Sequence, residues 1–305
     1  MAAEPEIEID MMELADIGQP MKLALEIHRQ LRAQFDQVPT QLPLASLAKA
    51  VGIVGIKEIA TDDFEGTLVV QDGFGAIGLR KGLRSGRRNF TIGHEIGHFV
   101  IPNHRFGRDK FQCAIVDMGR ERSGGNWDSR PPLERIEVEA NEFSAALLVP
   151  VPEFQKERRR LGTACDIVHI RQLAETFDVS QEMMAKIYVN ASDESAAIIT
   201  SHRGLVRRVI PKSGFPYLGL RRDAPIPATA LTSTFRPGGG QSSISDLCEV
   251  ATHTWLDRKG SVSALYEQVF VQEDGWAMTL LIADEEDSDD EDDDRDWNRR
   301  SDRQM

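Results

Sequence analysis

The feature that most constrains this chain is a pair of histidines four residues apart. Residues 94–98 read His-Glu-Ile-Gly-His, and residues at this spacing lie on the same face of an α-helix, one turn from each other. Two imidazoles held in this way can bind one metal ion; zinc is the default for such ligands, and manganese or iron would also fit them. The spacing therefore predicts a helix that carries two metal ligands, His94 and His98.

The residues around this segment favour a helix. Asn89 is a suitable N-cap, and Pro102 ends a helix that is predicted from about Phe90 to Val100. Glu95 is rotated away from the two ligands but stays close to the metal, where it can take a proton from a water molecule that the metal acidifies. We therefore predict Glu95 as the general base. A surface helix that carries two histidines by chance is the alternative.

A catalytic metal site of this kind needs a third protein ligand, which a second helix can supply. Pro131 and Pro132 suit the first turn of a helix that ends before Pro150. Glu137 is the favoured ligand, because Asn141 lies four residues later on the same face and can orient a ligand histidine by a hydrogen bond. Glu139 points to nearly the opposite side of this helix. The other glutamates of the helix remain as alternatives: Glu134, Glu139 and Glu142.

Two further residues of ligand type lie in a long loop that is predicted from Asn103 to Arg130. No spacing such as Cys-x-x-Cys supports Cys113 as a ligand, so we expect a small buried hydrophobic residue there. His104 is expected to be an exposed loop residue or a substrate contact.

Composition and charge exclude several classes of protein. No apolar run is long enough to span a membrane, and the N-terminus lacks the basic start and apolar core of a signal peptide. Three scattered cysteines are typical of reduced thiols, so we expect a cytoplasmic protein. The net charge is −13, of which residues 284–303, with twelve acidic and four basic side chains, carry −8 and the remainder −5. We expect no direct binding of nucleic acid.

Local patterns divide the chain into four parts of an α+β protein. Residues 1–19 are expected to be flexible. Residues 20–190 are predicted to form a unit of helices around a small sheet, with a pair of helices at 167–189. Residues 191–283 are predicted to form a β-rich domain for sensing or substrate docking, and residues 284–305 a disordered acidic tail.

The individual elements follow from periodicity and turn residues. The clearest is a hairpin, Leu265–Val271 and Trp276–Ala283, whose strands alternate around Glu273-Asp274-Gly275. Helices are predicted at Pro20–Phe35, Pro43–Ala50, Val168–Phe177, Gln181–Val189 and Ser243–Leu256, and further strands at Ile53–Ile59, Gly66–Val70, Gly75–Leu79, Ala196–Thr200, Gly204–Ile210 and Phe215–Leu220. The pair at 167–189 has a helix-turn-helix pattern, but Lys186 is the only positive charge of its second helix. Structural packing is therefore favoured over DNA binding.

Two segments together resemble a known family. Residues 88–98, Arg-Asn-Phe-Thr-Ile-Gly-His-Glu-Ile-Gly-His, and residues 137–150, Glu-Val-Glu-Ala-Asn-Glu-Phe-Ser-Ala-Ala-Leu-Leu-Val-Pro, look like the two signature segments of the ImmA/IrrE-type metallopeptidases. Gly93 and Val149 stand where Ala and Met are more usual, a departure that should not affect the chemistry. The resemblance implies a zincin-like, gluzincin-type unit in which Glu137 is the third ligand.

The resemblance also implies a function. Such proteins are metal-dependent endopeptidases that cut a transcriptional repressor, usually a helix-turn-helix protein of the XRE type, and so relieve repression under stress or mobile-element induction. The alternative is a non-catalytic binding partner of a helix-turn-helix protein, as in a toxin–antitoxin-like pair. Glu95 favours the enzyme, because a protein that only binds need not keep a base beside its ligands.

Overall fold

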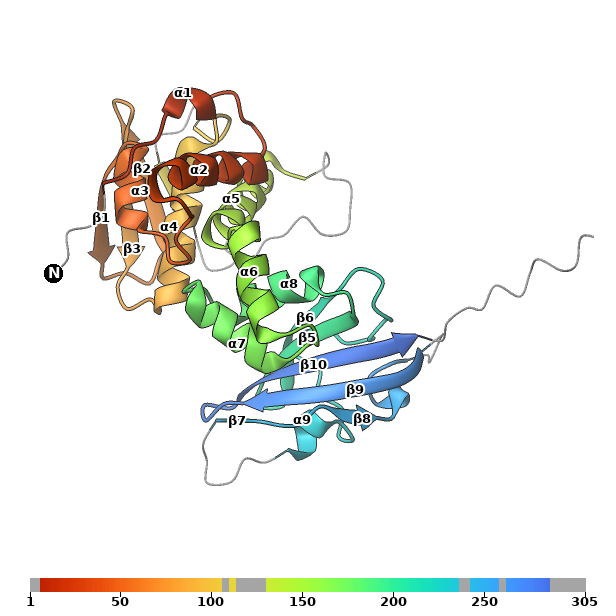
Figure 1. Ribbon diagram of the computed structural model, residues 1–305. Coiled ribbons are helices and arrows are strands. Elements are labelled where there is room, and N and C mark those ends of the chain that lie inside the picture. The colour runs from red at the N-terminus through yellow and green to blue at the C-terminus, as the bar shows by residue number, and fades with distance from the viewer. Residues whose placement is uncertain (1–5, 106–109, 114–129, 236–241, 258–261, 286–305) are drawn as a thin grey trace, which may run out of the picture. The chain divides into compact units, whose positions relative to one another are not determined.

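The computed structural model describes residues 6–105, 110–113, 130–235, 242–257 and 262–285 (Figure 1). The chain is mixed α+β, as predicted, and divides into two compact units. Unit 1 comprises Met1–Thr163 and Val168–Ile187, and unit 2 comprises Ala164–Ile167 and Tyr188–Met305.

Unit 1 contains a mixed sheet with the strand order β1-β3-β2-β4 within the described residues. Its strands are β1 (Ile53–Ile59), β2 (Gly66–Gln71), β3 (Phe74–Arg80) and β4 (Lys110–Cys113). β1 pairs with β3 in parallel, and the other pairs are antiparallel. The first three strands confirm the sequence prediction. The prediction of a loop throughout 103–130 was wrong at β4, because the backbone of β2 supplies a partner that the local sequence does not reveal.

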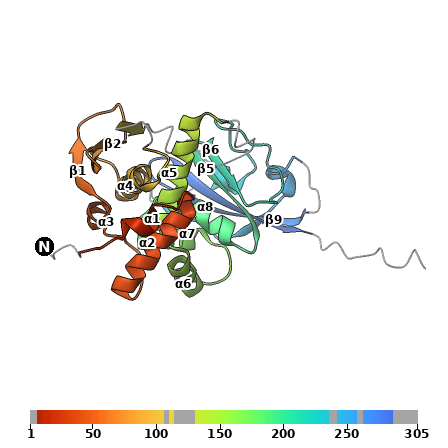
Figure 2. The ribbon, with the colours of Figure 1, turned by 90° about the horizontal axis from the view of Figure 1, so that it is seen from above.

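The described helices of unit 1 are α1 (Met11–Leu14), α2 (Pro20–Phe35), α3 (Leu44–Ala50), α4 (Ser85–Val100), α5 (Pro132–Leu148), α6 (Val151–Leu161), α7 (Ile167–Thr176) and α8 (Gln181–Ala191), the last two with residues of unit 2 at one end. Of these, α3 and α4 lie against the sheet (Figure 2). α2 buries Leu23, Ile27 and Leu31, as their spacing predicts. α4 contacts β2 and β3, and α5 packs on both α4 and α2. The sheet and α2 therefore hold the two helices that carry the predicted ligands.

The start of α4 differs from the prediction. The helix begins at Ser85, five residues before the predicted start, and Asn89 lies inside it rather than capping it. The Asn89 side chain instead donates to the Asp178 backbone carbonyl (3.0 Å) and carboxylate (2.8 Å), in the turn between α7 and α8. Gly86 meets the same turn so closely that a Cβ there would lie 2.5 Å from the carbonyl carbon of Val179. This turn therefore packs on α4, the helix that carries His94 and His98.

Unit 2 is built on an antiparallel sheet with the order β6-β5-β10-β9-β7 in its described part, and β8 also pairs with β9. The strands are β5 (Ser195–His202), β6 (Leu205–Pro211), β7 (Ser243–Ile244), β8 (Cys248–Val250), β9 (Val262–Val271) and β10 (Trp276–Glu285). β9 and β10 confirm the predicted hairpin, and β5 and β6 the predicted strand pair. Ile199, Leu265 and Leu281 are buried in the core of this unit.

Two predictions for unit 2 were wrong. Phe215–Leu220 is not a strand: it contains Pro216, which has no N–H to donate, and Gly219, whose φ is +62°. Ser243–Leu256 is not a helix but forms β7, β8 and a short 3-10 turn, because its backbone pairs with β9. The buried carboxylate of Glu267 on β9 anchors this segment by accepting a hydrogen bond of 2.8 Å from Trp255 Nε1.

The two ends of the chain are described in part. In the N-terminal segment that the sequence predicts to be flexible, the structure places α1, whose Leu14 is buried. The predicted disordered tail lies outside the described residues beyond Glu285. Over the part of the chain that is described, no helix combines the length and apolar character needed to cross a membrane.

Candidate metal centre

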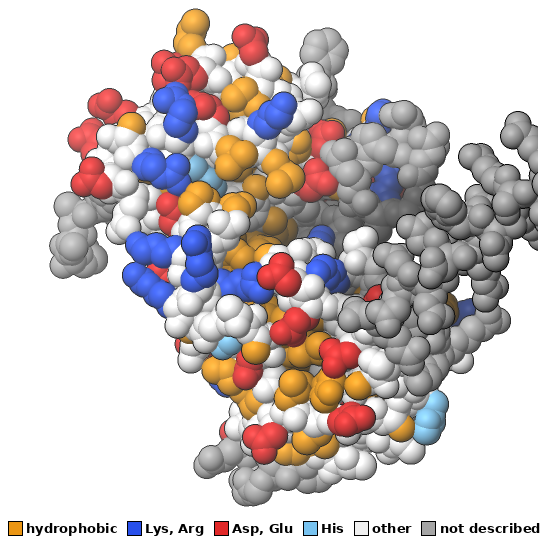
Figure 3. Space-filling view, turned by 45° about the vertical axis from the view of Figure 1, so that its right-hand side comes forward, with side chains coloured by type: hydrophobic (Ala, Val, Ile, Leu, Met, Phe, Trp, Pro, Cys, Tyr) orange, Lys and Arg blue, Asp and Glu red, His pale blue; other side chains and the backbone are white. Residues whose placement is uncertain are grey.

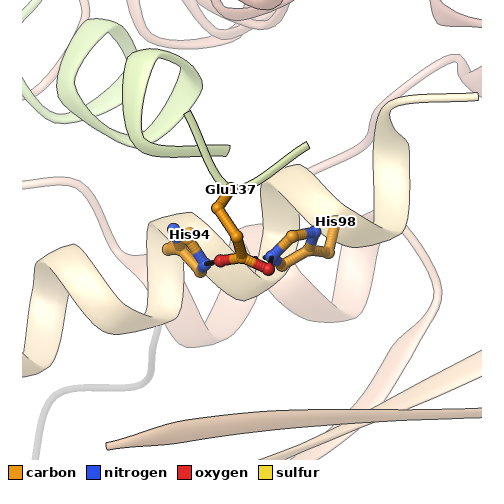
Figure 4. Close-up of side chains that lie close together, drawn as sticks. All are labelled: His94, His98 and Glu137. Carbon is orange, nitrogen blue, oxygen red and sulfur yellow. Dashed lines mark hydrogen bonds and ion pairs between the residues drawn. The ribbon is translucent and has the colours of Figure 1, made fainter. Parts of the chain in front are cut away.

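The structure brings together the side chains of His94, His98 and Glu137 (Figure 4). Their candidate ligand atoms all lie within 4.8 Å of one another. His94 Nε2 lies 2.9 Å from His98 Nε2, and the Glu137 carboxylate lies 3.2 Å from the first nitrogen and 3.6 Å from the second. Ligand atoms that share a tetrahedral ion at about 2.0–2.1 Å are roughly 3.3 Å apart. The three distances therefore suit one small divalent cation, while its binding remains a prediction.

Two glycines of α4 allow α5 to come close enough for this arrangement. A Cβ on Gly97 would lie 2.9 Å from Phe143 Cδ1, and a Cβ on Gly93 would lie 2.6 Å from Ser144 Oγ. The Ser144 hydroxyl uses that space to donate to the Phe90 carbonyl at 2.8 Å. Gly93 stands where Ala is more usual in the family that the two segments resemble, and here it packs against Ser144 of α5.

The electrostatics of the site favour the protonation states that bind metal. The two histidine side chains are fully buried, whereas that of Glu137 is 15% exposed. Burial, reinforced by the neighbouring His94, lowers the pKa of His98 to about 3. For Glu137, burial alone would raise the pKa, but the adjacent imidazoles of His94 and His98 outweigh it and hold the pKa well below its ordinary value. A neutral imidazole and an ionised carboxylate are the forms that a cation needs.

Asn141 lies where the sequence predicts an orienting residue. Its Oδ1 is 2.9 Å from Nδ1 of His94, and the residue is buried. Because an amide oxygen only accepts, the Nδ1 of His94 carries the proton, and its Nε2 lone pair is free to face Glu137 and His98.

His98 has an orienting partner that the sequence does not predict. His104 is 1% exposed, so the expectation of an exposed loop residue was wrong. Its Nδ1 lies 3.1 Å from Nδ1 of His98, and its Nε2 lies 2.9 Å from Oε2 of Glu139. A turn just after α4, closed by a hydrogen bond of 3.1 Å from His104 N to Ile101 O, folds the side chain back toward the site. No spacing motif announces this contact, because it depends on the turn and on α5 together.

Glu95 is fully buried on α4 and lies against the start of β2. A Cβ on Gly66 would lie 2.3 Å from Glu95 Oε1 and 2.5 Å from Thr91 Cγ2. The missing side chain at Gly66 therefore leaves the space that the predicted base occupies.

The other candidate ligands do not join the metal group. Among the residues that the structure describes, only His94, His98 and Glu137 meet as a group of metal-ligand type. Glu139 contacts His104 instead, and Glu134 and Glu142 stay outside the group. The side chain of Cys113 lies outside the described part of the chain.

The surface around unit 1 carries charges of both signs. Two arginines that precede or begin α4, Arg80 and Arg87, bind the buried carboxylate of Glu65, with hydrogen bonds of 2.9 Å and 2.6 Å. On the face drawn in Figure 3, basic and acidic side chains both appear in several places, and the largest group of neighbouring basic side chains lies at the left. Arg80 and Arg87 therefore have an internal structural partner in Glu65.

Comparison with known proteins assigns no family to the chain. No family model and no curated protein matches it. Among solved structures, a Mycobacterium tuberculosis transcriptional regulator is similar, with a TM-score of 0.48 and 12% identity over 90% of this chain and 74% of that one. A likeness this distant carries no argument about function.

Proposed function

We propose that this protein is a metal-dependent endopeptidase of the ImmA/IrrE type, with a zincin-like unit whose metal is held by His94, His98 and Glu137. The observation that supports it is the meeting of three ligand atoms from two helices that carry the paired family-like segments. The donor set suits zinc first, and manganese or iron as well. Such an ion supplies Lewis acidity, which polarises a peptide carbonyl and acidifies water.

Glu95 is proposed as the general base. Its carboxylate takes a proton from the attacking water and passes it to the nitrogen of the leaving amine, so one residue serves both halves of the hydrolysis. Gly66 gives the carboxylate its place beside β2, and Asn141 fixes the proton of His94 on the nitrogen that faces away from the ligand group.

The proposed substrate is a cytoplasmic regulatory protein, a helix-turn-helix repressor of the XRE type. Cleavage would relieve repression under stress or mobile-element induction. This part of the proposal depends on the resemblance of residues 88–98 and 137–150 to the family segments.

The test compares wild type with Glu95→Gln, Glu137→Ala and a control on the same helix, Glu134→Gln. We expect wild type, Glu95→Gln and Glu134→Gln to hold one equivalent of metal by elemental analysis, and Glu137→Ala to lose it. Each tagged protein is then expressed in the native host and purified with its partners, whose ends are mapped by mass spectrometry.

A helix-turn-helix repressor that arrives intact with Glu95→Gln and cut with wild type would support the peptidase. If Glu95→Gln cleaves as fast as wild type, the assignment of the base is wrong. If the same repressor co-purifies intact with wild type and with every variant under every stress, the proposal of an enzyme is wrong. The protein is then better described as a non-catalytic binding partner of that repressor.

A further inference from the structure

We propose that His104 and Glu139 are positioning residues that fix the orientation and proton of the metal ligand His98. The chain of contacts runs from His98 Nδ1 to His104 Nδ1 (3.1 Å) and from His104 Nε2 to Glu139 Oε2 (2.9 Å). This inference rests on the proposed metal site but not on peptidase activity. In this proposal His104 orients His98 in the way that Asn141 orients His94.

One arrangement of protons satisfies both contacts with neutral rings. His98 turns Nε2 toward His94 and Glu137, so its proton must lie on Nδ1 for the lone pair of Nε2 to bind a cation. His104 then accepts that proton's hydrogen bond through Nδ1 and carries its own proton on Nε2. That N–H donates to the carboxylate of Glu139. Each ring is thereby held as a single tautomer.

The burial of the three residues supports a positioning role. The side chains of His98 and His104 are fully buried, so water does not compete for the contact between them. Glu139 is 24% exposed at its side chain, so its charge keeps contact with solvent. A buried imidazole is therefore linked to a solvated carboxylate, which is the arrangement that makes a ligand histidine more basic.

The two ligand histidines consequently have unequal partners. His94 donates to a neutral amide oxygen, that of Asn141, whereas His98 donates to an imidazole that is itself backed by a carboxylate. The second arrangement also ties the turn after α4 to α5, because His104 and Glu139 come from these two segments. Loss of His104 should therefore loosen the hold of His98 on the metal, while His94 keeps its partner.

The test uses two substitutions that differ in one acceptor atom. In His104→Asn, the amide oxygen can take the place of Nδ1 and accept from His98, whereas His104→Leu has similar bulk and no acceptor. The matched control is His253→Leu, because His253 is an exposed histidine of unit 2. The zinc dissociation constant is measured by competition with a chelator, and the visible spectrum of the Co²⁺-loaded protein reports the ligand geometry at the metal.

We expect His104→Leu to weaken zinc binding by about 10- to 100-fold and to change the Co²⁺ spectrum. His104→Asn should stay close to wild type in both measurements, and Glu139→Ala should fall between the two. Thermal unfolding of the metal-free proteins separates these effects from a loss of folding. If His104→Leu does not fold, His104→Ala replaces it in the comparison with His104→Asn.

Two results would overturn the inference while leaving the metal site in place. One is a His104→Leu protein that binds zinc as tightly as wild type with an unchanged Co²⁺ spectrum. The other is an equal loss in His104→Asn and His104→Leu, which would mean that ring packing matters and the acceptor atom does not. A wild-type protein that binds no divalent metal would refute the proposed function and this inference together.

Discussion

Gly97→Ala probes the distance between the two ligand helices. The added Cβ would lie 2.9 Å from Phe143 Cδ1 and 3.4 Å from Ala140 Cα. Carbon atoms in relaxed contact are about 3.5–4.0 Å apart, so α4 and α5 would have to separate locally by roughly 0.6–1.1 Å. The proposed histidine ligands lie on α4 and Glu137 lies on α5, so this movement acts directly on the distance between them.

The expected effect on stability is small because two contributions oppose each other. Alanine favours a helix over glycine by about 1 kcal/mol, and overpacking costs about 1–3 kcal/mol. We therefore expect the free energy of unfolding of the metal-free protein to fall by about 0–2 kcal/mol. Metal sites tolerate shifts of only about 0.2 Å in ligand distances. The zinc dissociation constant should therefore rise by at least about tenfold, out of proportion to the loss of stability.

Chelator competition measures the affinity, and urea unfolding of the metal-free protein measures the stability. The control is Gly55→Ala on β1, where an added Cβ meets nothing within 4 Å and φ is not positive. A Gly97→Ala protein that binds zinc as tightly as wild type would refute the argument that helix separation sets the ligand geometry.

Gly66→Ala places a Cβ 2.3 Å from Glu95 Oε1. We therefore expect cleavage of the substrate to fall while the metal content, measured by elemental analysis, stays at the wild-type level. Loss of metal as well would show that the change is not confined to the base. His28 Nε2 donates to the carbonyl of Leu147, near the end of α5, at 2.8 Å, and burial lowers the pKa of His28 below its ordinary value. The pKa of His28 is therefore lower in the folded state than the value near 6.5 in the unfolded state. The buried, neutral imidazole contributes fully to stability above about pH 6.5, and this contribution is lost as the pH falls from there toward the folded-state pKa. Urea unfolding at pH 8 and pH 5 should therefore show a smaller pH effect in His28→Gln than in wild type, and equal effects would contradict this account.

The positions of the proposed ligands could be predicted from local sequence because helical periodicity decides them. His94 and His98 share a face of α4 by their spacing alone, and the same spacing relates Glu137 to Asn141 on α5. The hairpin of β9 and β10 could be predicted in the same way, because its alternation of apolar and polar residues and its turn are local features of the sequence. Each of these features involves residues that are close in the chain.

What the sequence does not reveal depends on contacts between distant segments. His104 becomes a partner of His98 only when the turn after α4 meets Glu139 of α5. The stretch 243–256 has a pattern that favours a helix, yet pairing with β9 draws it into β7 and β8. In the same way, Asn89 looks like a helix cap until Asp178, from the turn between α7 and α8, binds its side chain. Tertiary partners override local preference at each of these places.

A metal ion bound at the proposed site would act as a reversible cross-link, because its ligands are far apart along the chain. His94 and Glu137 are joined by about 40 residues of chain, and closing a loop of that length in an unfolded chain costs on the order of 3 kcal/mol. All three proposed ligands belong to unit 1. Each tenfold rise in free metal above the dissociation constant should then add about 1.4 kcal/mol to the stability of unit 1. A chelator titration followed by calorimetry would accordingly move the unfolding transition of unit 1 and leave that of unit 2 unchanged, so that one half of the molecule responds to metal supply while the other does not.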